Sequence, residues 1–139
     1  MTHDPLIDIQ DLQVHFPIKG GLLRRTAGVV KAVDHVSFQI GKNETVGLVG
    51  ESGCGKSTVG RAIVRLNEAT GGKILYQDQD ILSLRGEALR KLRHNLQIVF
   101  QDPYSSLNPR YTVKRLIAEV LTVQKGYSTS EAYKRVGEL

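Results

Sequence analysis

The chain has 139 residues, of which 40% are hydrophobic and 24% charged, and its formal net charge is +5. This length suits one modest domain with a core of its own. Charged residues interrupt every apolar run before it is long enough to cross a bilayer, and the first residues lack the pattern of a secretory signal. The single cysteine allows no internal disulfide. Together these features predict a cytoplasmic protein.

Two strands are predicted near the N-terminus. Residues 7–16 alternate between hydrophobic and polar side chains, which predicts one strand with a slip or two short strands. Residues 17–29 contain a proline and three glycines and favour a loop or a hairpin. Residues 30–40 carry hydrophobic side chains at alternate positions and predict a second strand. Antiparallel strands at this point are unlike the start of a simple Rossmann fold.

A glycine-rich segment follows, over residues 50–58. Its sequence, GESGCGKST, fits the phosphate-binding pattern G-x-x-x-x-G-K-[ST]. The short apolar, β-branched segment 45–49 precedes it and predicts a buried strand. After it, hydrophobic residues from Val59 to Leu66 recur at helical spacing. Strand, glycine loop and helix in this order are what a phosphate-binding loop requires.

The residue types in this segment suit a triphosphate and Mg²⁺. Glycines allow backbone turns that direct successive N–H groups at phosphate oxygens, and the helix N-terminus adds unpaired N–H groups. We predict that Lys56 places its charge against the β- and γ-phosphates, and that Ser57 offers its hydroxyl to Mg²⁺. A loop that merely turns a corner is the competing interpretation. The predicted nucleotide-binding residues here are Gly50, Glu51, Ser52, Gly53, Cys54, Gly55, Lys56, Ser57 and Thr58.

Shorter elements are predicted in the rest of the chain. Residues 73–76 and 96–100 have the composition of strands, and residues 84–93 have that of a helix. Two prolines keep residues 101–109 out of regular structure.

Two helices are predicted at the C-terminal end. Thr112 is placed to cap a helix that Gly126 ends, and residues 128–131 have the spacing of a capping box that opens another. The second helix has no stop signal before Leu139, so we expect the sequence to be part of a longer protein.

The basic residues gather over residues 19–31 and 85–94. No aromatic side chains lie between them to form a stacking platform, and a solvated helix face explains the second group. We expect no nucleic-acid partner.

Three segments resemble the ATP-binding subunits of ABC transporters, more narrowly those of oligopeptide and dipeptide importers. They are residues 29–38 (VVKAVDHVSF), the glycine loop, and residues 98–109 (IVFQDPYSSLNP), whose Gln-Asp-Pro and Ser-Leu-Asn-Pro are the most specific part. The resemblance covers the whole chain. It implies an α/β fold: a P-loop NTPase core with an antiparallel β subdomain over residues 1–109, and the start of a helical subdomain over residues 110–139.

The resemblance also implies roles for individual residues. Gln101 matches the Q-loop glutamine, whose side chain approaches Mg²⁺ and the attacking water, so Lys56 and Gln101 are the predicted catalytic residues. Phe16 is the best match to the aromatic residue that stacks on adenine, and His15 is the second. An ordinary core position in a strand is the competing interpretation of Phe16.

Partners are implied in the same way. In the family, the Q-loop region contacts transmembrane permease subunits, a second ATP-binding subunit completes each ATP site, and an extracytoplasmic solute-binding protein delivers the solute. This predicts a peripheral protein on the cytoplasmic face of the membrane. The family's signature motif, later carboxylate-bearing strand and switch histidine are absent from this sequence. We therefore expect residues 1–139 alone to bind nucleotide weakly and to hydrolyse little.

Three other functions fit part of the pattern. A kinase or switch-type P-loop enzyme would use Asp102 as its Mg²⁺ ligand. An ABC-type ATPase of DNA repair or chromosome maintenance would share the loop. A non-enzymatic nucleotide-sensing module would need the loop alone.

Overall fold

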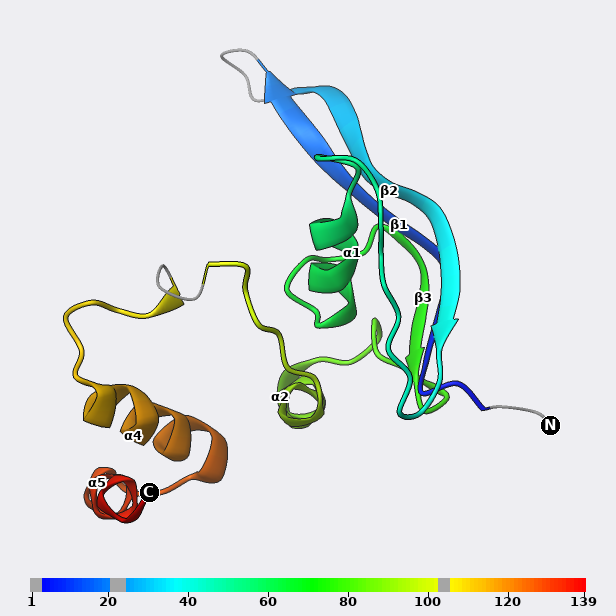
Figure 1. The fold of residues 1–139 in the computed structure, drawn as a ribbon. Helices are drawn as coiled ribbons and strands as arrows, with labels where there is room; N and C mark the ends of the chain where they lie inside the picture. The colour runs from blue at the N-terminus through cyan, green and yellow to red at the C-terminus, as the bar shows by residue number, and fades with distance from the viewer. Residues whose placement is uncertain (1–3, 21–24, 103–105) are drawn as a thin grey trace. The chain divides into compact units, whose positions relative to one another are not determined.

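The structure is a computed structural model that describes residues 4–20, 25–102 and 106–139 (Figure 1). The chain divides into two compact units, residues 1–96 and 97–139. In chain order the elements are β1 (Ile7–Gly20), β2 (Arg25–Ile40), α1 (Lys56–Ile63), β3 (Gly71–Tyr76), β4 (Gln79–Asp80), α2 (Gly86–Asn95), α4 (Val113–Lys125) and α5 (Thr129–Glu138).

The first unit is built on one antiparallel sheet with strand order β2-β1-β3-β4. The long pair β1 and β2 runs from Ile7 opposite Ile40 to Gly20 opposite Arg25. Residues 17–20 and 25–29 therefore continue the two paired strands, and the strands predicted over residues 7–16 and 30–40 are confirmed. The strand β3 pairs with β1 only as far as Gln13 opposite Gly71. Beyond that point β2 is the strand that pairs with β1.

Irregular pairing interrupts the middle of the hairpin. The register shifts between Ile9 and Leu12, between Leu12 and Val14, and between Val14 and His15. Asp11 and His35 have φ angles of 52° and 54°, in the left-handed region that L-residues seldom adopt. Such bulges bend a strand and increase its twist. They explain why the alternation of residues 7–16 predicts a strand with a slip.

The core of the first unit lies where helices cover the sheet. In Figure 1, α1 lies beside the sheet, and its Val59 and Ala62 are buried as the helical spacing predicts. The helix ends earlier than predicted, at Ile63, because Arg65 has a φ of 58°. Leu66 lies beyond the helix and is exposed. The buried cluster consists of Ile7, Ile9, Leu12, Val14, Val33, Val59, Ala62, Ile74, Ile81 and Leu92.

Two predicted strands are absent from the sheet. Residues 45–49 and 96–100 are not assigned as strand, and Val49 and Val99 are 93% and 91% exposed. A parallel strand is stable only between neighbours that cover its polar edges and both faces. The four strands of the sheet lie elsewhere in the sequence, so the prediction of strands at these two places is wrong for this structure.

The second unit contains a pair of helices with well-formed ends. Thr112 Oγ1 accepts a hydrogen bond from the Arg115 backbone N–H at 3.3 Å, and Gly126 ends α4 with a φ of 70°. Ser128 and Glu131 form the capping box of α5. All three predicted helix ends are confirmed. Within the described residues, no helix is long and apolar enough to span a membrane.

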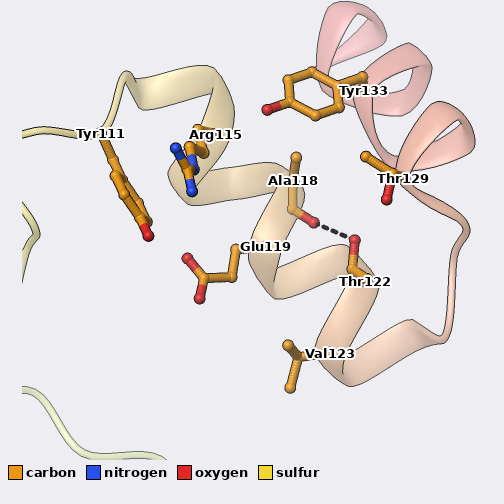
Figure 2. Close-up of a pocket in the computed structure, with 8 residues that line it drawn as sticks. All are labelled: Tyr111, Arg115, Ala118, Glu119, Thr122, Val123, Thr129 and Tyr133. Carbon is orange, nitrogen blue, oxygen red and sulfur yellow. Dashed lines mark hydrogen bonds between the residues drawn. The ribbon is translucent and has the colours of Figure 1, made fainter.

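Between α4 and α5 lies a shallow pocket, which Figure 2 shows with its lining residues. The Arg115 guanidinium stacks 3.7 Å from the centroid of the Tyr111 ring at one side. On α4, the Thr122 hydroxyl donates a hydrogen bond of 2.9 Å to the Ala118 carbonyl oxygen. Ala118 and Ala132 are the buried residues of the two helices. Small side chains at these positions let the helices approach closely.

Candidate functional site

The backbone of the glycine loop adopts conformations that would be strained for residues with a Cβ atom. Gly53 and Gly55 have φ angles of 85° and 94°, as the pattern predicts. A Cβ atom on Gly55 would also collide with the Ala32 carbonyl oxygen of β2. Gly50 does not have a positive φ, and its reason is different: a Cβ there would lie 2.6 Å from Cys54 Sγ. The loop is therefore folded tightly on itself and lies directly against the hairpin.

The loop feeds directly into the N-terminus of α1. Gly55 is the N-cap residue, no side chain caps the helix, and its first turn contains no acidic residue. The first intrahelical bond runs from the Val59 N–H to the Gly55 carbonyl oxygen at 3.0 Å. The N–H groups before it have no partner within a helix, and the helix dipole favours an anion beside them. This end of α1 therefore suits a phosphate group.

Lys56 folds back over the loop. Its Nζ donates hydrogen bonds to the carbonyl oxygens of Gly50 and Glu51, at 2.8 and 2.6 Å. In the described part of the chain, no acidic side chain forms an ion pair with Lys56. Neutral carbonyls thus hold the ammonium group at the loop and leave its charge uncompensated there.

A pocket of about 350 Å³ lies beside the loop. One wall is the β2 segment from Lys31 to Val36, and the loop supplies Cys54, Gly55 and Lys56. Leu48 and Val49 also contribute, so the segment predicted as a strand lines this pocket instead. The hairpin and the loop meet at this place in the first unit.

The other loop residues are mostly accessible. Glu51, Ser52, Ser57 and Cys54 are exposed, and Thr58 is half-buried at the start of α1. Among the residues that the structure describes, no group of three or more His, Cys, Asp or Glu side chains could hold a metal ion. The hydroxyl of Ser57, which is predicted to bind Mg²⁺, is exposed at the start of α1.

Phe16 lies on β1, opposite Val30 on β2, and is 43% exposed. It does not belong to the buried cluster of the first unit, nor does it line the pocket beside the loop. His15 is half-buried, and its Nε2 lies 3.0 Å from Asp34 Oδ1. The His15 hydrogen bond, followed by that of Lys31, lowers the pKa of the Asp34 carboxyl below its usual value.

Gln101 and Asp102 belong to the second unit, whereas Phe16 and residues 50–58 belong to the first. Gln101 is exposed in a bend just after residues 96–100. The Ser106 hydroxyl donates a hydrogen bond to the Asp102 carbonyl oxygen at 3.0 Å.

Sequence analysis missed two residues next to the loop. Ala32 contributes a backbone oxygen, which no residue pattern reveals, and Asp34 contributes a carboxylate that joins the two long strands. Only the pairing register brings them to the site.

Comparisons with known proteins agree with this geometry. The family model described as ABC transporter matches residues 33–139. The oligopeptide transport ATP-binding protein AppF of Bacillus subtilis is 49% identical over 99% of this chain, and the glutathione import ATP-binding protein GsiA of Pectobacterium atrosepticum is 48% identical over 98%. This chain spans 42% of the first relative's length and 22% of the second's.

A solved structure supports the fold. The dimeric ATP-binding cassette MJ0796, bound to ADP and Pi, aligns with a TM-score of 0.71 at 26% identity, covering 95% of this chain and 54% of that one. The predicted α/β fold with an antiparallel β part is thereby confirmed. The sequence match and the loop geometry lead to the same conclusion: the chain belongs to the ABC transporter family.

Proposed function

We propose that this chain is part of an ATP-binding subunit that powers the import of peptides or similar small solutes. The main support for ATP binding is the glycine loop. Gly53 and Gly55 have positive φ angles, which glycine adopts far more readily than other residues. Lys56 has no acidic partner in the described part of the chain. Importer subunits are also among the relatives of this chain, and they share nearly half of its residues.

In this proposal, each part of the site contacts a different part of ATP. Backbone N–H groups of residues 50–58 bind the phosphates, and Lys56 moves from the loop carbonyls to the β- and γ-phosphates. Ser57 and Gln101 hold Mg²⁺, which neutralises phosphate charge when bound. Phe16 contacts adenine. The exchange of carbonyl for phosphate strengthens the hydrogen bonds of Lys56, because the new acceptors are charged.

Hydrolysis is proposed for the natural full-length protein. The catalytic residues within this chain are Lys56 and Gln101, where Gln101 orients the attacking water. Residues 1–139 alone are expected to bind ATP weakly and to turn over little. Turnover by residues 1–139 that depends on Lys56 would contradict this part of the proposal.

The proposed partners follow from the same assignment. Permease subunits bind through the Gln101 region, a second ATP-binding subunit completes the site, and a solute-binding protein acts indirectly. With these partners, the protein would act on the cytoplasmic face of the membrane. The alternative with Asp102 as the Mg²⁺ ligand of a kinase or switch is not favoured, because the ABC transporter model matches from residue 33 to 139.

The test is equilibrium binding of ATP with Mg²⁺ to the natural full-length protein. We expect Lys56→Ala to weaken binding by about a hundredfold, the effect of losing charge-assisted hydrogen bonds to phosphate. Lys42→Ala is the matched control, since Lys42 is an exposed lysine of the turn after β2. Absence of ATP binding by the wild type, or equal binding by Lys56→Ala, would contradict the proposal.

A further inference from the structure

The Asp34 carboxylate joins the two long strands at one point. Its Oδ1 lies 3.0 Å from His15 Nε2, and its Oδ2 accepts a hydrogen bond from Lys31 Nζ at 3.2 Å. His15 and Lys31 lie directly opposite each other on β1 and β2. One carboxylate therefore holds both members of a cross-strand pair. His35 Nε2 also lies near Oδ1, at 3.9 Å.

The His15–Lys31 pair lies directly after the irregular part of the hairpin. The last of the three central register shifts lies between Val14 and His15. From His15 the pairing continues in step, with Phe16 opposite Val30 and Ile18 opposite Gly28. Successive side chains of a strand point to opposite faces, so a slip of one residue would turn Phe16 to the other face.

Past His15 and Lys31, toward the far end of the two strands, few buried side chains fix the register of β1 against β2. Val14 and Val33 are 0% and 3% exposed, whereas Phe16 and Val30 are 43% and 49% exposed. The pairing with β3 also stops before His15, at Gln13. A strand without a buried face slips more easily. The polar bridge at Asp34 is thus the specific cross-strand contact next to Phe16.

The same part of β2 touches the glycine loop. The Ala32 carbonyl oxygen lies against Gly55, and residues 31–34 line the pocket together with Cys54 and Lys56. A change in the β2 register would therefore move Phe16 relative to the loop.

We propose that Asp34 is a positioning residue: its carboxylate fixes the register that presents Phe16 for contact with the adenine ring of ATP. This inference rests on the proposed function, in particular on the assignment of Phe16 to adenine. A change at Asp34 should therefore weaken binding of the adenine base. It should not weaken binding of the phosphates, which residues 50–58 contact. The Asp34 carboxyl is charged at neutral pH, as the bridge requires, and the hydrogen bonds from His15 and Lys31 lower its pKa further.

The test compares two ligands, ATP and inorganic triphosphate, each with Mg²⁺, by calorimetry on the natural full-length protein. Asp34→Ala is expected to raise the Kd for ATP about tenfold, within the range of losing one base–aromatic stack. The Kd for triphosphate is expected to change less than about twofold. Glu68→Ala removes an exposed acidic side chain of the same unit and is the control.

A double-variant cycle separates positioning from a general loss of structure. Phe16→Ala is expected to weaken ATP binding as Asp34→Ala does, and adding Asp34→Ala to Phe16→Ala is expected to have almost no further effect. Should Asp34→Ala fail to fold, Asp34→Asn keeps the volume, loses the charge and is expected to show the same pattern to a smaller degree.

Equal weakening of both ligands by Asp34→Ala, no weakening, or additive effects of the two changes would overturn the inference. Failure of the proposed function gives a different result, because the wild type would then bind neither ligand. If the wild type binds both and Phe16→Ala leaves ATP binding unchanged, the inference about Asp34 is overturned while the phosphate site stands.

Discussion

The strands of the antiparallel sheet and the segments 45–49 and 96–100 have similar amino-acid compositions but different structures. Both are rich in β-branched and aliphatic residues. In the sheet these side chains are buried, as Val14 and Ile74 are at 0% exposure, whereas Val49 and Val99 are almost fully exposed. A strand thus needs neighbours as well as composition: hairpin neighbours follow directly in the sequence, and parallel neighbours come from distant segments.

The glycine loop lies between these two kinds of region. Gly55 of the loop packs against the Ala32 carbonyl oxygen of β2, and the loop follows directly after segment 45–49 in the chain. The loop keeps its shape although that segment is not in the sheet. Its conformation is therefore set by its own glycines, by Lys56 and by contact with the hairpin.

The contact of the loop with the sheet offers the largest expected effect. Gly55→Ala forces a Cβ into the Ala32 carbonyl oxygen at a φ of 94°, and we expect a loss of stability of about 3 kcal/mol or more in urea unfolding. Gly60→Ala in the same helix meets nothing within 4 Å and is expected to stabilise by about 0.5–1 kcal/mol. Equal effects of the two changes would show that the loop does not depend on the hairpin.

A pair of valines tests the comparison itself. In residues 1–139, Val14→Ala is expected to lower the free energy of unfolding by about 2 kcal/mol, because the lost methyl groups are buried. Val49→Ala removes the same groups from an exposed side chain and is expected to change stability by less than about 0.5 kcal/mol. Similar costs for both valines in residues 1–139 would contradict the account.

The helices of the second unit, like the hairpin, are stabilised by residues close to them in the sequence. Ser128→Ala removes the hydroxyl that accepts from the Glu131 N–H, and we expect a loss of about 1 kcal/mol in the stability of α5. Far-UV circular dichroism during thermal unfolding measures it. Lys134→Ala, an exposed change in the same helix, is the control and should leave the transition nearly unmoved.

The pH dependence of the same helix end gives the smallest effect. Hydrogen bonds from the Ser128 hydroxyl and backbone N–H lower the pKa of Glu131 below its usual 4.5. The folded state therefore binds this proton less readily than the unfolded state, so the contribution to stability is complete above the usual pKa and is lost as the pH falls through the lowered one. Glu131→Gln keeps an acceptor without a titrating group. Circular dichroism from about pH 7 to about pH 3 should show a loss of α5 in the wild type that the variant lacks; parallel curves would contradict this.

Much of this structure could be predicted where the signal is local. The caps at Thr112, Gly126 and Ser128 and the positive φ angles of Gly53 and Gly55 follow from short-range geometry, and the structure confirms them. The sequence alone leaves two alternatives for residues 17–29, because their glycines favour a loop as much as a hairpin between strands; the pairing of β1 with β2 supports the hairpin.

What could not be predicted depends on distant parts of the chain. Segments 45–49 and 96–100 have strand composition, yet their state depends on neighbours that composition does not reveal. The contact of Ala32 with the loop and the bridge from Asp34 to His15 depend on the register of a bulged hairpin. The roles of Phe16, Ser57 and Gln101 remain predictions.

The proposed function depends on backbone N–H groups of residues 50–58 that hold the phosphates of ATP. Hydrogen exchange of these amides, followed in the natural full-length protein with and without ATP and Mg²⁺, tests it most directly. We expect slower exchange in residues 50–58 when ATP is present, and no such slowing in Lys56→Ala at the same ATP concentration. Unchanged exchange of these amides at saturating ATP in the wild type would contradict it.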